Sequence, residues 1–510
     1  MFLAVLAVVV GVAGTGVTRW PGYGDDEGTY VAQAWAVLHG QGLSHYTYWY
    51  DHPPLGWLQL AALRGLAGPL LGGMQAVAAG RLLMLVPLTA SYTLLWAWAR
   101  RLGLRAPAAA GAVLLLGLSP LAVAFLRSVY LDGIALPWVL AAFFLAATPR
   151  SRLWSYAGSG ACFAVAVLSK ETMLLVLPAL LVQIWHTCDR RTRAFCVTAF
   201  GCVLAAIGLT YPLYAGLKSE LLPGRGHVSL LSAVAFQLGG RASTGTPLNS
   251  SSGSAGLVHT WLALDPWLLG MGVIAAPVAY VLKRGLRPPA VALGLLVVAG
   301  LRPGYLPEPY VVMLLPMAAV VVAGLVDAAV GPVRVPAASR GQGRRLRPAV
   351  VLVLTGVLII AGLAPAWSAG LHSATTSDAT GPTRAAVRYL TASVDRHARV
   401  MVDDTFYVDL VQAGFTEQTG VVWFYKIDRS AGLDPSVIER LPRGWRELDY
   451  VVSSPVLRAA LAQQPNGLTD VRAAVQASTV MATFGSGEQR VEIRRLRGPG
   501  LGSGALSGAG

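Results

Sequence analysis

The chain opens with FLAVLAVVVGVAGTGV (Phe2–Val17), which holds no charged side chain, and continues with TRWPGYGDDEGTY (18–30), which contains the triplet Asp25-Asp26-Glu27. Charge so close to a membrane span is costly and usually serves a function. The opening run lacks a basic start, and further apolar runs follow it in place of a soluble domain, which argues against a cleaved signal peptide. We interpret it as a retained span; a start codon upstream of Met1 would also explain the missing basic residues.

Composition indicates a membrane protein. The 510 residues are 55% hydrophobic and only 13% charged, with a mean hydropathy of +0.56. Soluble domains carry about 25% charged residues, so the deficit indicates several spans of about 20 apolar residues each. The net charge of +15 comes mainly from arginine, as expected of a GC-rich genome, and we expect no nucleic-acid partner. The four cysteines, Cys162, Cys188, Cys196 and Cys202, lack the spacing of a metal site.

Hydropathy and loop charge together predict eleven membrane spans, at about 1–18, 74–99, 107–125, 132–148, 155–168, 172–187, 195–215, 262–282, 288–301, 310–330 and 348–367. Every second connection is strongly basic. By the positive-inside rule these connections face the cytoplasm, and the other loops face outward together with everything after the last span. We therefore expect a multi-pass protein of the cytoplasmic (plasma) membrane, with a transmembrane domain over residues 1–370.

After the last span the pattern changes to that of a soluble domain. Residues 376–497 carry more charge, and alternating strands are predicted at 399–404, 448–453, 480–484 and 490–495, with a helix over 456–464. We expect a small outward-facing α/β domain here, with Asp403-Asp404 as a turn at the end of a strand. The glycine-rich residues 498–510 are predicted to be a disordered tail.

The first outward loop, about 19–73, is too long for a simple connection. Residues 30–38 and 55–66 each have the pattern of a short amphipathic helix, the second starting after Pro53-Pro54. Two such helices would hold the acidic triplet at the membrane surface. A later outward loop, residues 239–256, is rich in Ser, Gly and Thr, and we expect it to be a flexible lid.

Four basic residues lie at predicted outer edges of spans, where topology does not call for positive charge: Arg81, Arg127, Lys170 and Arg302. They could reach lipid phosphates at the surface, or they could share an anionic ligand such as a phosphate group. Other outward residues also have two interpretations. Asp132 could cap a helix, Lys170 and Glu171 could form a surface ion pair, and Tyr305 with Tyr310 could belong to the interfacial aromatic belt.

In their order and on one membrane face, these motifs resemble the GT-C polyprenyl-phosphate-sugar-dependent glycosyltransferases, which include the family 39 protein O-mannosyltransferases and the aminoarabinose transferases. The matching pieces are Asp26-Glu27-x-x-Tyr30, His52-Pro53-Pro54-Leu55-x-Trp57, Arg127 to Asp132, Ser169-Lys170, and Tyr305 to Tyr310 with Pro316. The aminoarabinose transferases typically have lysine before the double proline, where this chain has His52. The extra Asp25 is a second departure.

The resemblance implies a membrane glycosyltransferase that moves a sugar from a polyprenyl-phosphate donor to a glycan, lipid or protein of the cell envelope, with inversion. Asp26 is then the expected general base, with Asp25 as its substitute and Glu27 and Asp132 as further catalytic carboxylates. The donor would be bound by Arg81, Arg127, Lys170, Arg302, His52, Tyr305 and Tyr310, and positioned by Tyr30 and Tyr50. A divalent cation, if one takes part, would be held by Glu27 or Asp132; no other cofactor is expected.

Three other functions compete with this interpretation. A secondary transporter would place ionisable residues in mid-membrane and show repeated halves, and neither pattern is found in the sequence. A lipid-linked oligosaccharide polymerase or ligase would use a diphosphate carrier. A membrane receptor with an outward sensor domain needs no catalytic carboxylate.

Overall fold

A computed structural model describes residues 1–44, 46–48, 50–148, 152–224, 227–330, 365–428 and 435–496. Its residues fall into two compact units. The first, here called the helical unit, comprises Met1–Val17, Tyr50–Gln59 and Leu83–Thr376. The second, the α/β unit, comprises Thr18–Trp49, Leu60–Leu82 and Ser377–Gly510. Most of the predicted first loop therefore belongs to the same unit as the C-terminal residues.

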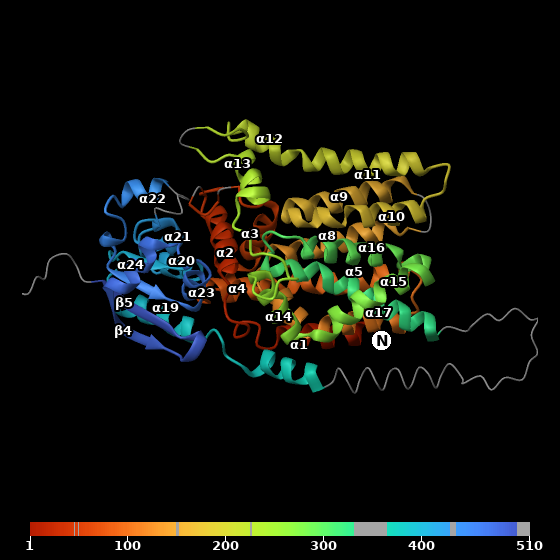
Figure 1. The fold of residues 1–510 in the computed structure, drawn as a ribbon. Helices are drawn as coiled ribbons and strands as arrows, with labels where there is room; N and C mark the ends of the chain where they lie inside the picture. Colours follow the sequence, from red (N-terminus) through yellow and green to blue (C-terminus); the bar gives the residue numbers. More distant parts are fainter. Residues whose placement is uncertain are drawn as a thin grey trace, which may run out of the picture. The chain divides into compact units, whose positions relative to one another are not determined.

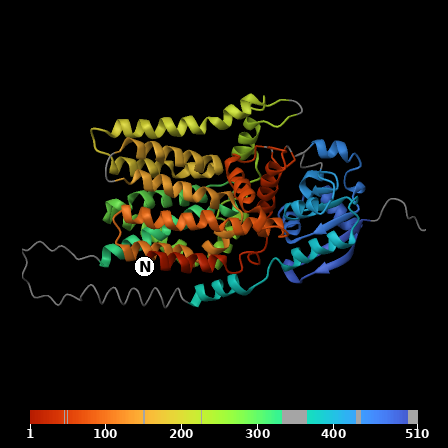
Figure 2. The ribbon, with the colours of Figure 1, turned by 180° about the vertical axis from the view of Figure 1, so that it is seen from behind.

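The helical unit consists of apolar helices, many of which run side by side (Figure 1) (Figure 2). They are α1 (Phe2–Gly14), α5 (Leu85–Arg101), α6 (Ala106–Leu118), α7 (Pro120–Arg127), α8 (Leu131–Ala146), α9 (Leu153–Ser169), α10 (Leu177–Thr187), α11 (Arg193–Gly208), α12 (Thr210–Leu217), α13 (Leu230–Ala235), α14 (Gly253–Leu264), α15 (Pro266–Leu282), α16 (Arg287–Leu301) and α17 (Val311–Val330). Short η helices include η2 (Glu171–Val176), η3 (Phe236–Gly240), η4 (Arg284–Leu286) and η5 (Glu308–Tyr310).

Helices occupy every predicted span from 1–18 to 310–330. By length and composition, four helices of the described chain can each cross a membrane, and six can if each of two bent pairs counts as one span. One of these pairs is α6 with α7, bent by 71° where a single span was expected; Pro120, at the start of α7, cannot continue the ladder of α6. The number eleven stays a prediction, and most of the expected last span lies outside the described residues.

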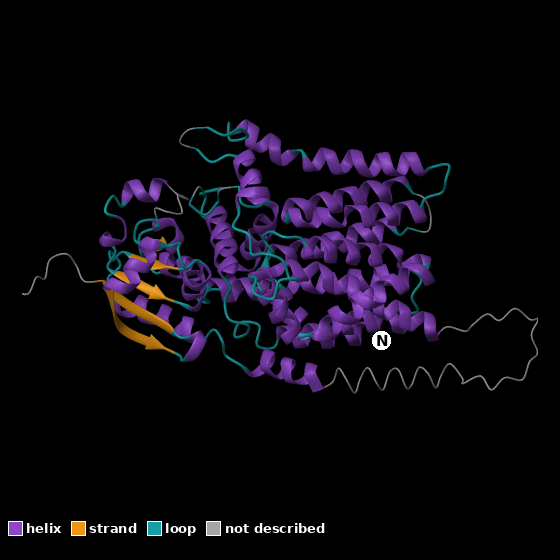
Figure 3. Ribbon diagram, in the orientation of Figure 1, coloured by secondary structure: helices purple, strands orange, loops and turns teal. Residues whose placement is uncertain are grey.

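The α/β unit is built on a five-stranded sheet of order β2-β1-β3-β5-β4 (Figure 3). Its strands are β1 (Val400–Val402), β2 (Val421–Trp423), β3 (Tyr450–Ser453), β4 (Ser478–Phe484) and β5 (Val491–Leu496). β1 pairs in parallel with β2 and β3, whereas β5 pairs antiparallel with β3 and β4. The predicted strands at 399–404, 448–453, 480–484 and 490–495 correspond to β1, β3, β4 and β5; β2 was not predicted.

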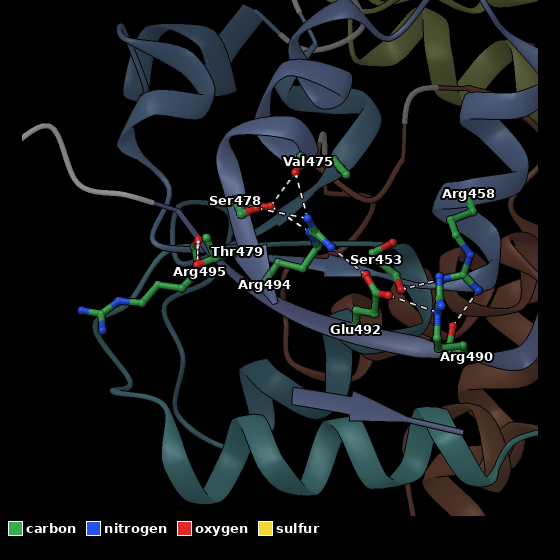
Figure 4. Close-up of polar contacts among 9 residues, drawn as sticks. All are labelled: Ser453, Arg458, Val475, Ser478, Thr479, Arg490, Glu492, Arg494 and Arg495. Atoms are coloured by element: carbon green, nitrogen blue, oxygen red, sulfur yellow. Dashed lines mark hydrogen bonds and ion pairs between the residues drawn. The ribbon is translucent and has the colours of Figure 1, made fainter. Parts of the chain in front are cut away.

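Helices accompany this sheet: α19 (Gly381–Ser393), α20 (Asp404–Gln412), α21 (Phe424–Ile427), α22 (Pro435–Arg440), α23 (Pro455–Gln463) and α24 (Thr469–Ala477). One helix joins parallel strands, and polar contacts lie at the antiparallel end of the sheet. The α20 helix is the crossover between the parallel strands β1 and β2. At the antiparallel end, Arg494 of β5 binds Glu492 at 2.7 Å, and Arg458 of α23 donates to the Arg490 carbonyl at 2.6 Å (Figure 4).

The first predicted loop, residues 19–73, contains two helices. The expected amphipathic helices are present as α2 (Asp25–Leu38) and α3 (Leu55–Ala67), and α4 (Ala76–Leu83) follows them. α2 packs on α20 inside the α/β unit. At Gly28 the two backbones touch, since a Cβ placed there would lie 2.3 Å from the carbonyl carbon of Asp404. Only glycine therefore fits at this position.

Candidate active site

The acidic triplet forms the first turn of α2, where carboxylates favourably face the positive end of the helix dipole. Glu27 also caps the helix, because its Oε1 accepts the backbone N–H of Gly24 at 3.0 Å. The three acids nevertheless have different surroundings. Glu27 is fully buried, whereas Asp25 and Asp26 are half-buried.

Glu27 is paired with Arg81 inside the α/β unit. The Arg81 guanidinium donates from Nε to Oε2 at 2.7 Å and from Nη2 to Oε1 at 2.5 Å. It also donates to the carbonyls of Pro21 and Gly22, at 2.7 and 2.9 Å, and lies over the Tyr23 ring. Both charged side chains are fully buried, and such a two-pronged pair fixes the orientation of Glu27. We had expected Arg81 at the membrane edge with a phosphate; its described contacts are instead internal.

Asp25 and Asp404 join α2 to the N-terminus of α20. The Asp25 carboxyl group lies close to the backbone of Asp404, and its Oδ1 has no hydrogen-bond partner among the described residues. Thr29 donates to Oδ2 of Asp404, and the Tyr425 hydroxyl donates to the same oxygen at 3.0 Å. Asp403 caps α20 through its bond with the Thr405 N–H at 2.9 Å. The predicted turn after β1 is therefore present, but it also contacts the acidic triplet.

Burial changes the acidity of this group of carboxyls. It raises the pKa of Asp404 to about 8, although the hydrogen bonds from Thr29 and Tyr425 limit the rise. Burial also raises the pKa of Asp25 well above its usual value, and the charges of Asp404, Asp403 and Asp26 add to that rise. Burial and the neighbouring carboxyl groups thus disfavour negative charge on Asp25.

Asp26 differs from both neighbours. Its side chain is half-buried, and no hydrogen bond or ion pair of its carboxylate is found in the described part of the chain. Asp26 is thus available to a substrate, whereas Glu27 is engaged by Arg81 and Asp25 lies beside Asp404. Tyr30, one turn further along α2, is 2% exposed and belongs to the core of the α/β unit.

A second polar cluster lies in the helical unit, where His52 links two residues that follow α9. Lys170 Nζ lies 2.9 Å from His52 Nε2. The other ring nitrogen, Nδ1, is 3.0 Å from both carboxylate oxygens of Glu171. The adjacent Lys170 and Glu171 do not simply pair with each other, because the imidazole bridges them.

Two further carboxyl groups interact electrostatically with this cluster. Asp132 lies in the first turn of α8 and is 3% exposed; Asp51 precedes His52. Among the described residues, Oδ2 of Asp132 and Oδ1 of Asp51 are shielded from solvent and have no hydrogen-bond partner. Burial raises the pKa of Asp51, and the neighbouring His52 opposes the rise. Unsatisfied buried oxygens are costly and mark places where a ligand can bind.

Residues between α11 and α14, including Tyr211 of α12 and Gln237 of η3, contact the backbone that carries this cluster, and the sequence did not indicate these contacts. Gln237 donates to the Asp51 carbonyl at 3.1 Å, and the Tyr211 hydroxyl donates to the His52 carbonyl at 3.2 Å. Tyr50 has a φ of 65°, a strained value for a non-glycine residue. Its hydroxyl donates to Glu220 at 2.6 Å, which holds it in place.

The remaining predicted donor residues lie elsewhere in the helical unit. Arg127 is buried and donates to the carbonyls of Thr15 and Ala374, at 3.0 and 2.7 Å. Arg302 is exposed. The Arg241 guanidinium lies over the Tyr305 ring, with its Cζ 3.6 Å from the ring centroid. The Tyr310 hydroxyl donates to the Leu296 carbonyl at 2.7 Å.

Two other expectations concern the lid and the metal. The segment 239–256 is hydrogen-bonded to the loop that carries Gly304, for example by the bond from the Thr244 N–H to the Gly304 carbonyl at 3.0 Å. In the described residues, no group of three or more His, Cys, Asp or Glu side chains is arranged to hold a metal ion.

Comparison with solved structures shows which fold the chain has. ArnT from Cupriavidus metallidurans, bound to undecaprenyl phosphate, matches with a TM-score of 0.59 and 16% identity over 97% of each chain. The oligosaccharyltransferase AglB from Archaeoglobus fulgidus, in complex with an inhibitory peptide and a dolichol-phosphate, matches with a TM-score of 0.55 and 10% identity over 96% of this chain and 74% of that one. Arabinofuranosyltransferase AftD from Mycobacteria matches with a TM-score of 0.50 and 15% identity over 97% of this chain and 40% of that one. The chain has the GT-C fold of these glycosyltransferases.

The family model agrees with this fold. Residues 51–214 match the dolichyl-phosphate-mannose-protein mannosyltransferase family. The matched stretch contains His52, Asp132 and Lys170, and begins after the acidic triplet. A search of curated protein sequences finds no match. The resemblance to GT-C glycosyltransferases that the motifs predicted is thus confirmed.

Proposed function

We propose that this protein is an integral membrane glycosyltransferase that moves a sugar from a polyprenyl-phosphate donor to a cell-envelope acceptor at the outer face of the plasma membrane. The observation that carries the proposal is the division of the acidic triplet. Glu27 is fixed by Arg81, and burial disfavours the charged form of Asp25 beside Asp404, so we assign the chemistry to Asp26. The family match over residues 51–214 supports the same reaction class.

The chemistry assigns one role to Asp26. An acceptor hydroxyl must lose its proton as it attacks the anomeric carbon, and a half-buried carboxylate can take that proton as general base. The bond from the anomeric carbon to the phosphate oxygen breaks as the new glycosidic bond forms. A single displacement of this kind inverts the anomeric centre.

Lys170 and His52 are the proposed donor-phosphate residues. The departing phosphate gains negative charge, which a nearby cation stabilises. Lys170 is 2% exposed, so its charge is little screened by water. Arg81 and Arg127 are engaged by internal partners and are better assigned to structure. Arg302, Tyr305 and Tyr310 stay candidates for positioning the donor.

The test is an assay of purified protein with a panel of polyprenyl-phosphate sugars and envelope acceptors, in which released polyprenyl phosphate is measured. NMR of the product should show an inverted anomeric centre. Transfer from polyprenyl-diphosphate sugars alone would instead identify a polymerase or ligase. No transfer from either donor, with sugar crossing the membrane in vesicles, would identify a transporter.

Replacing Lys170 by Ala should weaken use of the lipid donor by about ten- to a hundredfold, because the loss of one charge-assisted hydrogen bond costs about 1.5–3 kcal/mol. The apparent affinity for the acceptor should change little. Donor and acceptor titrations of initial rate provide the measurement. Arg284→Ala, at an exposed arginine of a predicted cytoplasmic loop, is the matched control and should leave both unchanged. A selective effect of Lys170→Ala on the acceptor would move Lys170 to the acceptor site.

The orientation has its own test. Reporter fusions placed after Arg347 and after Gly381 should report opposite sides of the membrane, the second one outside, because the basic loops alternate along the sequence. Active alkaline phosphatase and inactive green fluorescent protein at the second position would be the expected pair of results. A cytoplasmic signal there would contradict both the topology and an active site at the outer face.

A further inference from the structure

The hydrogen bond between Lys170 and His52 limits the charge that the pair can carry. A lysine ammonium has only donors, so the His52 Nε2 that lies 2.9 Å from it must accept. The ring proton is then on Nδ1, which faces Glu171 at 3.0 Å. One proton lies on the line between the two nitrogens. The pair therefore carries one positive charge, and a second proton would force the two groups apart.

The surroundings of this pair are acidic. Glu171 alone balances the single positive charge, and any ionised fraction of Asp51 or Asp132 makes the cluster negative. Lys170 and Asp132 are 2% and 3% exposed, so water screens these charges poorly. In the described part of the chain, the titratable groups that interact with His52 or its backbone include Lys170, Glu171, Asp51, Asp132 and Tyr211. An anion cannot bind well here unless positive charge is added.

We propose that binding of the donor phosphate at Lys170 and His52 is coupled to the uptake of one proton by the His52 imidazole. This inference rests on the proposed function. As the phosphate arrives, Lys170 turns from Nε2 to a phosphate oxygen, and the newly protonated Nε2 donates to another. Nδ1–H keeps its bond with Glu171, which stabilises the imidazolium. The bound state holds two cations against one phosphate and one carboxylate, and no covalent bond changes.

The coupling explains why a histidine can stand where related transferases carry a permanent cation before the double proline. It makes donor binding dependent on pH, with the dissociation constant rising up to tenfold per pH unit in the alkaline range. It also provides a route for release. Once the lipid phosphate leaves, the Lys170 ammonium repels the proton on His52 Nε2. That proton is lost as the hydrogen bond between Lys170 and His52 re-forms.

Calorimetry of the intact protein tests the coupling without turnover. The probe is a short-chain polyprenyl methyl phosphate, a phosphodiester whose own charge is constant between pH 6 and 9. Titrations at pH 7.5 in two buffers of different ionisation enthalpy give the number of protons taken up. About 0.5–1 proton per bound lipid is expected. Binding with no proton uptake would overturn the coupling but leave the donor site intact, whereas absence of binding from pH 6 to 9 would overturn both.

Two variants assign the proton to His52. His52→Lys carries a permanent charge, so it should bind the probe with little change from pH 6 to 9 and take up no proton. His52→Gln keeps a neutral side chain, so it should bind about tenfold more weakly at pH 6 and also show no uptake. His227→Gln, at an exposed histidine of the same unit, is the control and should behave like wild type. Undiminished uptake in both His52 variants would place the proton elsewhere and overturn the proposal.

Discussion

Asp26→Asn should lower the rate of sugar transfer by about 10²–10⁴-fold, the usual contribution of a general base, while the protein stays folded and inserted. The amide has nearly the shape of the carboxylate but cannot accept the acceptor's proton. Because the Asp26 side chain is only half-buried and has no described partner, the change should leave the fold unaffected. Single-turnover rates at saturating donor and acceptor measure the chemical step directly.

Asp25→Asn is the matched control for this prediction. Burial and the neighbouring carboxyl groups raise the pKa of Asp25 and disfavour its charged form, so we expect the uncharged asparagine to cause only a small loss of activity. The reverse result, in which Asp25→Asn is inactive and Asp26→Asn is active, would move the base by one residue. Activity in both variants would make the acidic turn purely structural.

Arg81→Met should destabilise the protein by about 3–5 kcal/mol and abolish transfer, because it leaves the Glu27 carboxylate buried without its partner. The Arg81 side chain is fully buried, so water cannot replace the guanidinium. The midpoint of thermal unfolding in detergent and the transfer rate are the two measurements. Arg64→Met, at a half-buried arginine of the same unit, should have a minor effect on both.

A double-mutant cycle separates charge from packing in this pair. Glu27→Gln combined with Arg81→Met removes both charges, so the double variant should be more stable than Arg81→Met alone. Its transfer rate should stay low, since Glu27 and Arg81 fix the turn that carries Asp26. A double variant as unstable as the sum of the two singles would show that the ion pair is not what stabilises this turn.

Much of the fold could be predicted from local patterns. Apolar runs and basic loops predicted the helices of the transmembrane region, and two-residue alternation predicted β1, β3, β4 and β5. β2 was missed because its residues do not alternate between apolar and polar, and α21 follows the strand directly. The association of residues 18–49 with the C-terminal residues was also missed. A local pattern can predict that a helix face is buried, but not which distant segment covers it.

The candidate site was predictable to a similar degree. The motif order identified Asp26, His52 and Lys170 as residues of interest, but it could not show that Glu27 binds Arg81 or that His52 bridges Lys170 and Glu171. These contacts join residues far apart in sequence. Gly28 could have indicated another such contact from the sequence. Glycine is unfavourable in the first turns of a helix, and its presence there is explained when another backbone lies against it.

The contact at Gly28 affects how hybrids between this protein and its relatives can be designed. Because α2 lies against α20 within one compact unit, the C-terminal residues are not an appendage that can be cut off or exchanged at residue 377. A hybrid with a relative's C-terminal domain must bring residues 18–49 and 60–82 from the same parent. The natural boundary for engineering therefore cuts the chain at five places rather than one, after residues 17, 49, 59, 82 and 376.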